Sequence, residues 1–464
     1  MKSDTTKVFF DYPLDVEFTD EQLANRPALM ESEIPLYYTA VKVDSDIQGD
    51  VFYKIMDELF IPEESDIFDS SDDPTGKSLQ SKAKEQLMEA LLYESYRLTG
   101  NEAEWVGEEN VGKPEAKWLF GRKWYPSEKI QIFDDVVGRL VPLEGVQVLI
   151  RQWFTVRKGY TNANGDFRTG SVRGSARYVI QWENYDYSIR NGSFFQAESK
   201  GRAGVKNASW NYNIGQGSDA QYYGMIHAAA YTYYHKNPFG IRTPPKNSFW
   251  KKQMKIAARK SSPWGVPSSF SHIRSQVSFG LSAQIHIKEW GSNCERIFGT
   301  TIHELAHAAH WTVDKLSYDN MVRGSLFNLS ETQRNHYQRL RETWPTTVET
   351  MFALERYRNG FNIAGYEYKR HPQEIRVNFG NLQRQTTAGE RFYTSGGYDM
   401  LDNFNQREHG VEFPVDRVSG YTLPQLEAAL VRAETWQDWR NNIKRMYPNN
   451  PTREFLDELF ANWE

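Results

Sequence analysis

One pattern constrains the fold of this chain more than any other: two histidines stand four residues apart, His303 and His307, and Glu304 follows the first of them. Residues at that spacing lie on one face of an α-helix, roughly 6 Å apart. Two threonines that can cap a helix precede the motif, and neither glycine nor proline interrupts the residues directly after it. The sequence therefore predicts a helix from near residue 299 to about residue 316 that presents both imidazoles on one side.

This arrangement is typical of a metal centre. Two imidazoles so placed can bind one tetrahedral Zn²⁺ ion at about 2.1 Å. Zinc lowers the pKa of a bound water toward about 7, and a neighbouring carboxylate can accept the proton of that water. Only 10 histidines occur in 464 residues, so a chance match is uncommon. The sequence predicts Zn²⁺ as cofactor, His303 and His307 as its ligands, and Glu304 as general base.

The segment Thr301–His307 resembles the zincin superfamily of metallopeptidases, whose signature is a His-Glu-x-x-His helix. Residues 201–464 as a whole resemble zinc-binding metallopeptidases of the Bacteroidetes type. The resemblance implies hydrolysis of peptide bonds in a peptide or protein substrate. It also implies that the strand before the helix, expected at residues 284–288, borders the cleft and pairs with extended substrate.

The third metal ligand has to come from beyond this helix. Metzincins place a third histidine after a glycine turn, but no glycine occurs between Gly299 and Gly324. His310 and Asp314 lie too far along a straight helix to share the metal. The gluzincin arrangement, in which a second helix supplies a glutamate, is the one left.

Two glutamates compete for that role, Glu342 and Glu349. Gluzincins often carry Glu-x-aromatic-Ala at this point, and Glu342 matches this pattern except that Pro345 replaces the alanine. Proline is tolerated in the first turn of a helix, so Glu342 would have to lie near a helix start. Seven helical residues span about 10 Å, so only one of the two can bind the metal. We predict Glu342, with Glu349 as the alternative.

Zincins often stabilise the oxyanion of the transition state with a tyrosine or histidine. Tyr398 and His371 are the candidates for that role in this sequence.

The pattern of residues 126–200 predicts strands and turns. Val146, Val148 and Ile150 alternate with their neighbours, and Asn164–Gly165 is a hairpin signal. The patterns over 142–148 and 159–167 resemble the transthyretin-like β-sandwich that forms the regulatory domain of carboxypeptidases. This resemblance implies a structural or attachment module without catalytic residues.

Charge and composition exclude some partners. A net charge of −5 is small for this length and argues against a nucleic-acid groove or a polybasic membrane surface. No run approaches the ~20 apolar residues of a transmembrane span, and no signal peptide is visible. The single cysteine, Cys294, excludes an intrachain disulfide. The resemblance alone implies export to the periplasm or cell surface, in the manner of a lipoprotein.

The expected fold is α+β. It consists of a partly helical N-terminal segment (1–125), a small β-sandwich (126–200) and a zincin-like metallopeptidase domain (201–464). The expected function is zinc-dependent peptide hydrolysis. The alternative is a non-catalytic cell-surface binding protein that keeps zinc for structure. A fourth protein ligand would support that alternative, whereas an open fourth position favours the enzyme.

Overall fold

The computed structural model describes most of the chain from residue 124 onward. The described ranges are 90–91, 93–95, 97–100, 102–103, 111–112, 124–152, 155–172, 175–192, 195–201, 205–246, 253–260, 269–270, 283–327, 330–368, 387 and 392–464. The predicted N-terminal segment therefore lies mostly outside the described residues, although residues 90–91, 93–95 and 97–98 are helical.

The strands of the described part are short and numerous in the first half of the region. In chain order they are β1 (Ser127–Asp134), β2 (Arg139–Pro142), β3 (Gln147–Gln152), β4 (Thr155–Tyr160), β5 (Asp166–Arg168), β6 (Arg177–Gln181), β7 (Tyr187–Asn191), β8 (Phe195–Gln196), β9 (Glu198–Lys200), β10 (Tyr212–Ile214), β11 (Met254–Ala258), β12 (Ser269–Phe270) and β13 (Ile285–Ile287).

Helices dominate after residue 215. They are α5 (Asp219–Tyr231), the π-helix η3 (Thr232–Lys236), α7 (Cys294–Val313), α8 (Lys315–Phe327), α9 (Glu331–Leu354), the π-helix η4 (Glu355–Gly360), α10 (Gly396–Asp399), the 3₁₀-helix η6 (Gln406–His409), α11 (Leu423–Ala428), α12 (Trp436–Met446), the 3₁₀-helix η7 (Arg453–Phe455) and α13 (Leu456–Ala461). The chain thus combines helices and sheets, as the α+β class requires.

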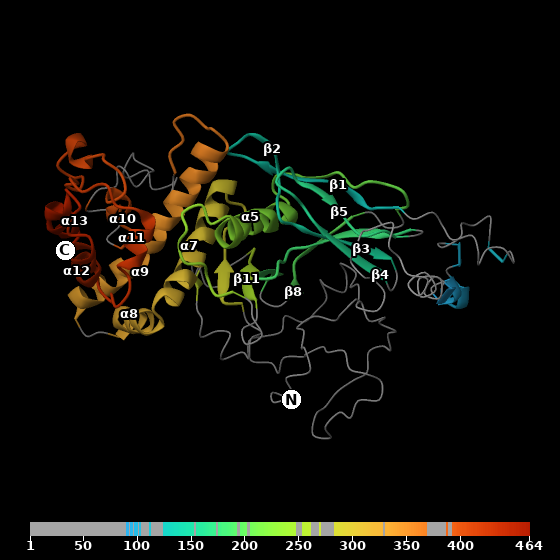
Figure 1. The fold of residues 1–464 in the computed structure, drawn as a ribbon, viewed down its shortest axis with the longest axis horizontal. Coiled ribbons are helices and arrows are strands. Elements are labelled where there is room, and N and C mark those ends of the chain that lie inside the picture. The colour runs from blue at the N-terminus through green and yellow to red at the C-terminus, as the bar shows by residue number, and fades with distance from the viewer. Residues whose placement is uncertain are drawn as a thin grey trace, which may run out of the picture.

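The described strands form three sheets. Strands β10, β1, β2 and β5 make one sheet, β4, β3, β6 and β9 a second, and β12, β13, β11, β7 and β8 a third. In the third sheet β11 runs parallel to both β7 and β13. In Figure 1 the sheets of β1–β5 lie at one end of the molecule and the C-terminal helices α11–α13 at the other, with α5, α7 and α9 between them.

These sheets cross the boundary predicted at residue 200. Strand β7 lies before that boundary and pairs with β11, whereas β10 lies after it and pairs with β1. One hydrophobic core cluster runs from Trp124 to Trp463 and includes side chains of both regions. The β-region and the region of the histidine motif therefore share sheets and a core.

The predicted hairpin at Asn164–Gly165 is wrong in one respect. The turn is present, and Gly165 has the positive φ of 78° that favours glycine. However, β4 pairs with β3 while β5 pairs with β1, so the two strands flanking the turn belong to different sheets. The turn signal is local, whereas the choice of strand partner depends on the core that both sheets enclose.

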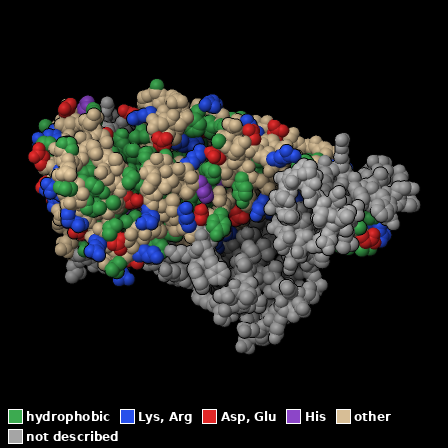
Figure 2. Space-filling view, viewed as in Figure 1, with side chains coloured by type: hydrophobic (Ala, Val, Ile, Leu, Met, Phe, Trp, Pro, Cys, Tyr) green, Lys and Arg blue, Asp and Glu red, His purple; other side chains and the backbone are tan. Residues whose placement is uncertain are grey.

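On the face shown in Figure 2, basic and acidic side chains are interspersed over the described part. No helix among the described residues is long and apolar enough to cross a membrane.

Candidate metal centre

The histidine motif lies in the middle of α7. This helix begins earlier than predicted, because the side chain of Asn293 caps it by accepting a hydrogen bond from the backbone of Arg296 at 2.9 Å. It also ends earlier, at Val313. Asp314 is extended (φ −152°, ψ 98°), and its carboxylate accepts from the backbone N–H of Ser317 in α8. The chain thus turns without a glycine, at a residue that caps the next helix.

The prediction that a helix begins close to Pro345 is wrong. Helix α9 starts far upstream, with Ser330 as its N-cap, and Pro345 lies in its interior together with Glu342. Proline removes one N–H donor, but tertiary burial of α9 from Glu342 to Thr350 outweighs that loss. Threonine hydroxyls supply extra hydrogen bonds to the helix carbonyls here, as from Thr346 to Glu342 at 2.7 Å.

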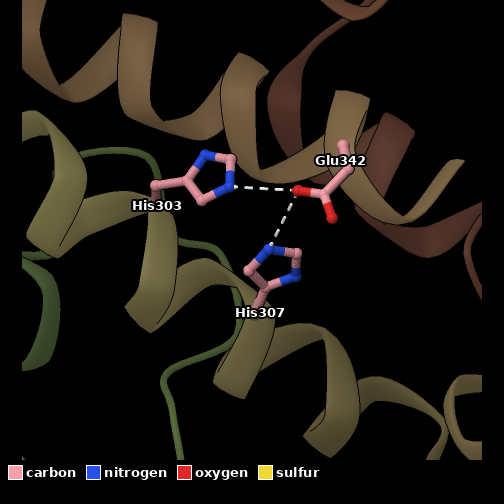
Figure 3. A group of neighbouring side chains, drawn as sticks. All are labelled: His303, His307 and Glu342. Carbon is pink, nitrogen blue, oxygen red and sulfur yellow. Dashed lines mark ion pairs between the residues drawn. The ribbon is translucent and has the colours of Figure 1, made fainter. Parts of the chain in front are cut away.

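Three side chains from two helices converge at the predicted site. The Nε2 atoms of His303 and His307 each lie 3.4 Å from Oε2 of Glu342. Figure 3 shows the two imidazoles projecting from α7 toward the carboxylate on α9. All three residues are buried, with exposures of 5%, 7% and 6%. The predicted choice of Glu342 over Glu349 agrees with this geometry, although the reasoning about the helix start does not.

The separation of these atoms fits a zinc ion. Two atoms that bind one tetrahedral zinc at about 2.0–2.1 Å lie about 3.3–3.4 Å apart. The observed 3.4 Å matches that value and is longer than a normal charge-assisted hydrogen bond. Two imidazole nitrogens and one carboxylate oxygen are also a donor set that zinc takes in catalytic sites.

Each of the two imidazoles contacts a second polar side chain through its Nδ1 atom. Nδ1 of His303 lies 3.0 Å from Oε2 of Glu349, and the other oxygen of Glu349 accepts from the hydroxyl of Tyr368. Nδ1 of His307 lies 3.4 Å from the hydroxyl of Tyr318. Glu349 thus contacts the nitrogen of His303 that faces away from Glu342 and does not join the three side chains that converge.

The charge states at neutral pH suit metal binding. Burial lowers the pKa of His307 to about 4, although Glu342 opposes that shift, so the imidazole is neutral and its Nε2 can donate a lone pair. Burial alone would raise the pKa of Glu342. The charges and hydrogen bonds of His307, His303 and Arg341 outweigh burial and hold that pKa well below its ordinary value. Glu342 is therefore ionised.

Glu304 lies beside these converging side chains. It adjoins His303 on α7 and is 4% exposed. Burial raises the pKa of Tyr318, whose hydroxyl lies next to His307, and the charges of Glu342 and Glu304 add to that shift, so the Glu304 carboxylate is close to the same group of side chains.

Other residues singled out from the sequence lie elsewhere. His310 is buried and packs edge-on against Tyr318, with ring centroids 5.0 Å apart. Tyr398 lines a cavity of about 210 Å³ beside Met351 and Leu354, and Met351 lies nine residues, about 13 Å, along α9 from Glu342. His371 lies outside the described residues.

Residues 284–288 were expected to pair with substrate, but the strand within them is already paired on both of its edges. Strand β13 has β11 on one side, and on the other side Ile285 and His286 pair with β12. All three of its residues are buried, because the strand is interior rather than half-exposed.

Sequence reasoning missed a tyrosine that does reach the site. Tyr393 lies 6.0 Å from His303 between ring centroids. Its segment is tied to α9, since the hydroxyl of Thr343 donates to the carbonyl of Phe392 at 2.9 Å. No motif marks Tyr393 in the sequence, because 50 residues separate it from Thr343 and only the fold brings them together.

Comparison with known proteins adds nothing to this geometry: no protein-family model and no curated protein matches the chain.

A glycine inside α7 gives a first test of this packing. A Cβ at Gly299 would lie 2.9 Å from Cζ of Tyr368 and 3.1 Å from Oε1 of Glu349. Gly→Ala in a helix interior ordinarily stabilises by about 1 kcal/mol. Gly299→Ala should instead destabilise the protein by about 1–3 kcal/mol, because it overpacks this contact. Urea unfolding measures the change, and Tyr368→Phe in the same chain should recover part of it. Additive effects of the two changes would contradict the contact.

Proposed function

We propose that this chain is a zinc-dependent metallopeptidase with a zincin-like catalytic region of the gluzincin type. One observation carries the proposal: Nε2 of His303 and Nε2 of His307 each lie 3.4 Å from Oε2 of Glu342, the separation that two ligands of one zinc take, and Glu304 adjoins His303 on the same helix. The same three residues would hold the zinc.

The chemistry divides between the metal and the protein. When bound, zinc would polarise a carbonyl and lower the pKa of a water. Glu304 accepts the proton of the attacking water and then delivers it to the leaving amine. Burial of Glu304 and of the ligand side chains keeps solvent from competing with these contacts.

Tyr393 is the candidate for stabilising the oxyanion, in place of Tyr398. Its ring adjoins that of His303. Against the opposing effect of burial, Glu342 raises the pKa of Arg341, and the charge of Tyr393 adds to that shift, so Tyr393 borders the side of the site where Glu342 lies. A phenolic hydroxyl can donate to the oxygen on which negative charge develops.

A purely structural zinc site is the weaker reading. Structural sites are closed by four protein ligands. Within the described part of the chain, the histidine cluster contains three residues, and no further His, Cys, Asp or Glu joins it at ligand distance. A fourth position would therefore be open to water or substrate.

Metal analysis tests the metal centre directly. We expect one zinc per chain in the wild-type protein and its loss from His303→Ala at neutral pH, because two donors remain. Mass spectrometry of the metal after gel filtration measures both. Stoichiometric zinc in the variant would place the ligands elsewhere. A peptide-library screen with the zinc-loaded protein then tests for hydrolysis, and no cleavage of any peptide would reject the peptidase assignment.

A further inference from the structure

Arg341 makes an unusual contact with the residue that follows it. Its Nε and Nη2 atoms lie 2.9 and 2.8 Å from the same atom, Oε1 of Glu342. Adjacent residues of a helix do not normally face each other, so helical geometry alone does not produce this pair. A further constraint has to bring the guanidinium to the carboxylate.

That constraint comes from α8. Nη1 of Arg341 donates to Oγ of Ser325 at 2.8 Å, and Ser325 in turn donates to the backbone of Val322 at 2.8 Å. The side chain of Arg341 is 21% exposed and that of Glu342 8%. The guanidinium is thus held between two helices, with three of its nitrogens committed.

As a consequence, the two carboxylate oxygens of Glu342 have different partners. Oε1 accepts a hydrogen bond from Nε of a permanently charged guanidinium and forms an ion pair with its Nη2, whereas Oε2 faces the two histidines at 3.4 Å. A carboxylate can bind a metal through one oxygen or both. An Oε1 that is already engaged leaves Oε2 alone for the metal.

We propose that Arg341 is a positioning residue that restricts Glu342 to one-oxygen ligation and so keeps a metal coordination position open for water or substrate. This inference rests on the metal centre of the proposed function. It requires no assumption about which peptide is cleaved.

Cobalt substitution supplies a readout that does not depend on activity. Four-coordinate Co²⁺ absorbs visible light more strongly than five- or six-coordinate Co²⁺. In Arg341→Met, Oε1 is released and can join the metal, so we expect retained cobalt with severalfold weaker visible bands. With zinc, kcat should fall about 10–100-fold with little change in KM, as for other residues that orient ligands.

Two further variants make the test specific. Arg341→Lys keeps the charge but cannot place two donors on Oε1 and a third on Ser325, so its spectrum and kcat should lie between those of wild type and Arg341→Met. If Arg341→Met fails to fold, Arg341→Lys decides alone. Arg323→Met removes an exposed arginine of α8 and should match wild type in both readouts.

The possible outcomes distinguish failure of this inference from failure of the proposed function. A wild-type spectrum and kcat in the folded Arg341 variants would overturn the inference. Loss of the metal from these variants would also overturn it, because Arg341 would then be needed for metal binding as such and not for the number of Glu342 oxygens that bind. Wild-type protein that binds cobalt tetrahedrally and cleaves no peptide would reject the peptidase alone. Wild-type protein that binds no metal would reject both.

Discussion

Replacing Glu304 with glutamine should lower kcat by about 10²–10⁴-fold while zinc stays bound. The amide fills the same buried space but cannot accept a proton from water. The proposed ligands His303, His307 and Glu342 are untouched, so the metal content should not change. Turnover of a peptide found in the library screen, together with metal analysis of the same sample, measures both effects.

Glu295→Gln is a matched control for this experiment. Glu295 is a buried carboxylate of the same helix, but it lies nine residues and about 13 Å before Glu304, where it interacts with Tyr366. Its amide can still accept a hydrogen bond, so turnover should stay near wild type. Equal turnover in wild type and Glu304→Gln would remove Glu304 from the mechanism.

The sequence was sufficient for the part of the site that lies within one helix. The spacing of His303, Glu304 and His307 is local, and any α-helix places the two imidazoles on one face. The ends of this helix were harder to predict from the sequence. Asn293 and Asp314 set them through capping, and each competes with nearby residues that are equally plausible caps.

The prediction of Glu342 as third ligand rests on a condition that the structure contradicts. Glu342 was favoured on condition that a helix begins near Pro345, yet α9 passes through Pro345 without a break. Proline disfavours a helix interior, but this stretch packs against α7 and α8, and that packing decides its conformation. Propensity is a local quantity and cannot include such contacts.

The sequence could not predict which residues contact the converging side chains from outside the motif. The roles of Glu349, Tyr368 and Arg341 depend on how α7, α8 and the segment after α9 pack together. The same holds for the β-region, where alternation predicted strands at residues 146–150 but could not show that β7 completes the sheet of β11. Periodicity reports which face is buried, and partner choice follows from the whole fold.

The two glutamates of α9 should differ sharply when each is removed. Glu342→Ala deletes one of three converging donors, so we expect no zinc to survive gel filtration. Glu349→Ala leaves all three donors in place and removes the acceptor at Nδ1 of His303, which fixes the orientation of the ring. Zinc affinity should then weaken by about 10–100-fold, the usual effect of losing such a partner. Competition with a chromophoric chelator measures both affinities.

Conservative changes sharpen this comparison, because alanine also leaves a cavity. In Glu349→Gln the amide oxygen can still accept from Nδ1 of His303, so affinity should fall less than in Glu349→Ala. Glu342→Gln replaces an anionic donor by a neutral one, so zinc should remain weakly bound or absent. The order of zinc affinity should therefore be wild type, Glu349→Gln, Glu349→Ala and then both Glu342 variants. Zinc retained by Glu342→Ala but lost from Glu349→Ala would reverse the assignment, since the metal would then lie on the Nδ1 side of His303.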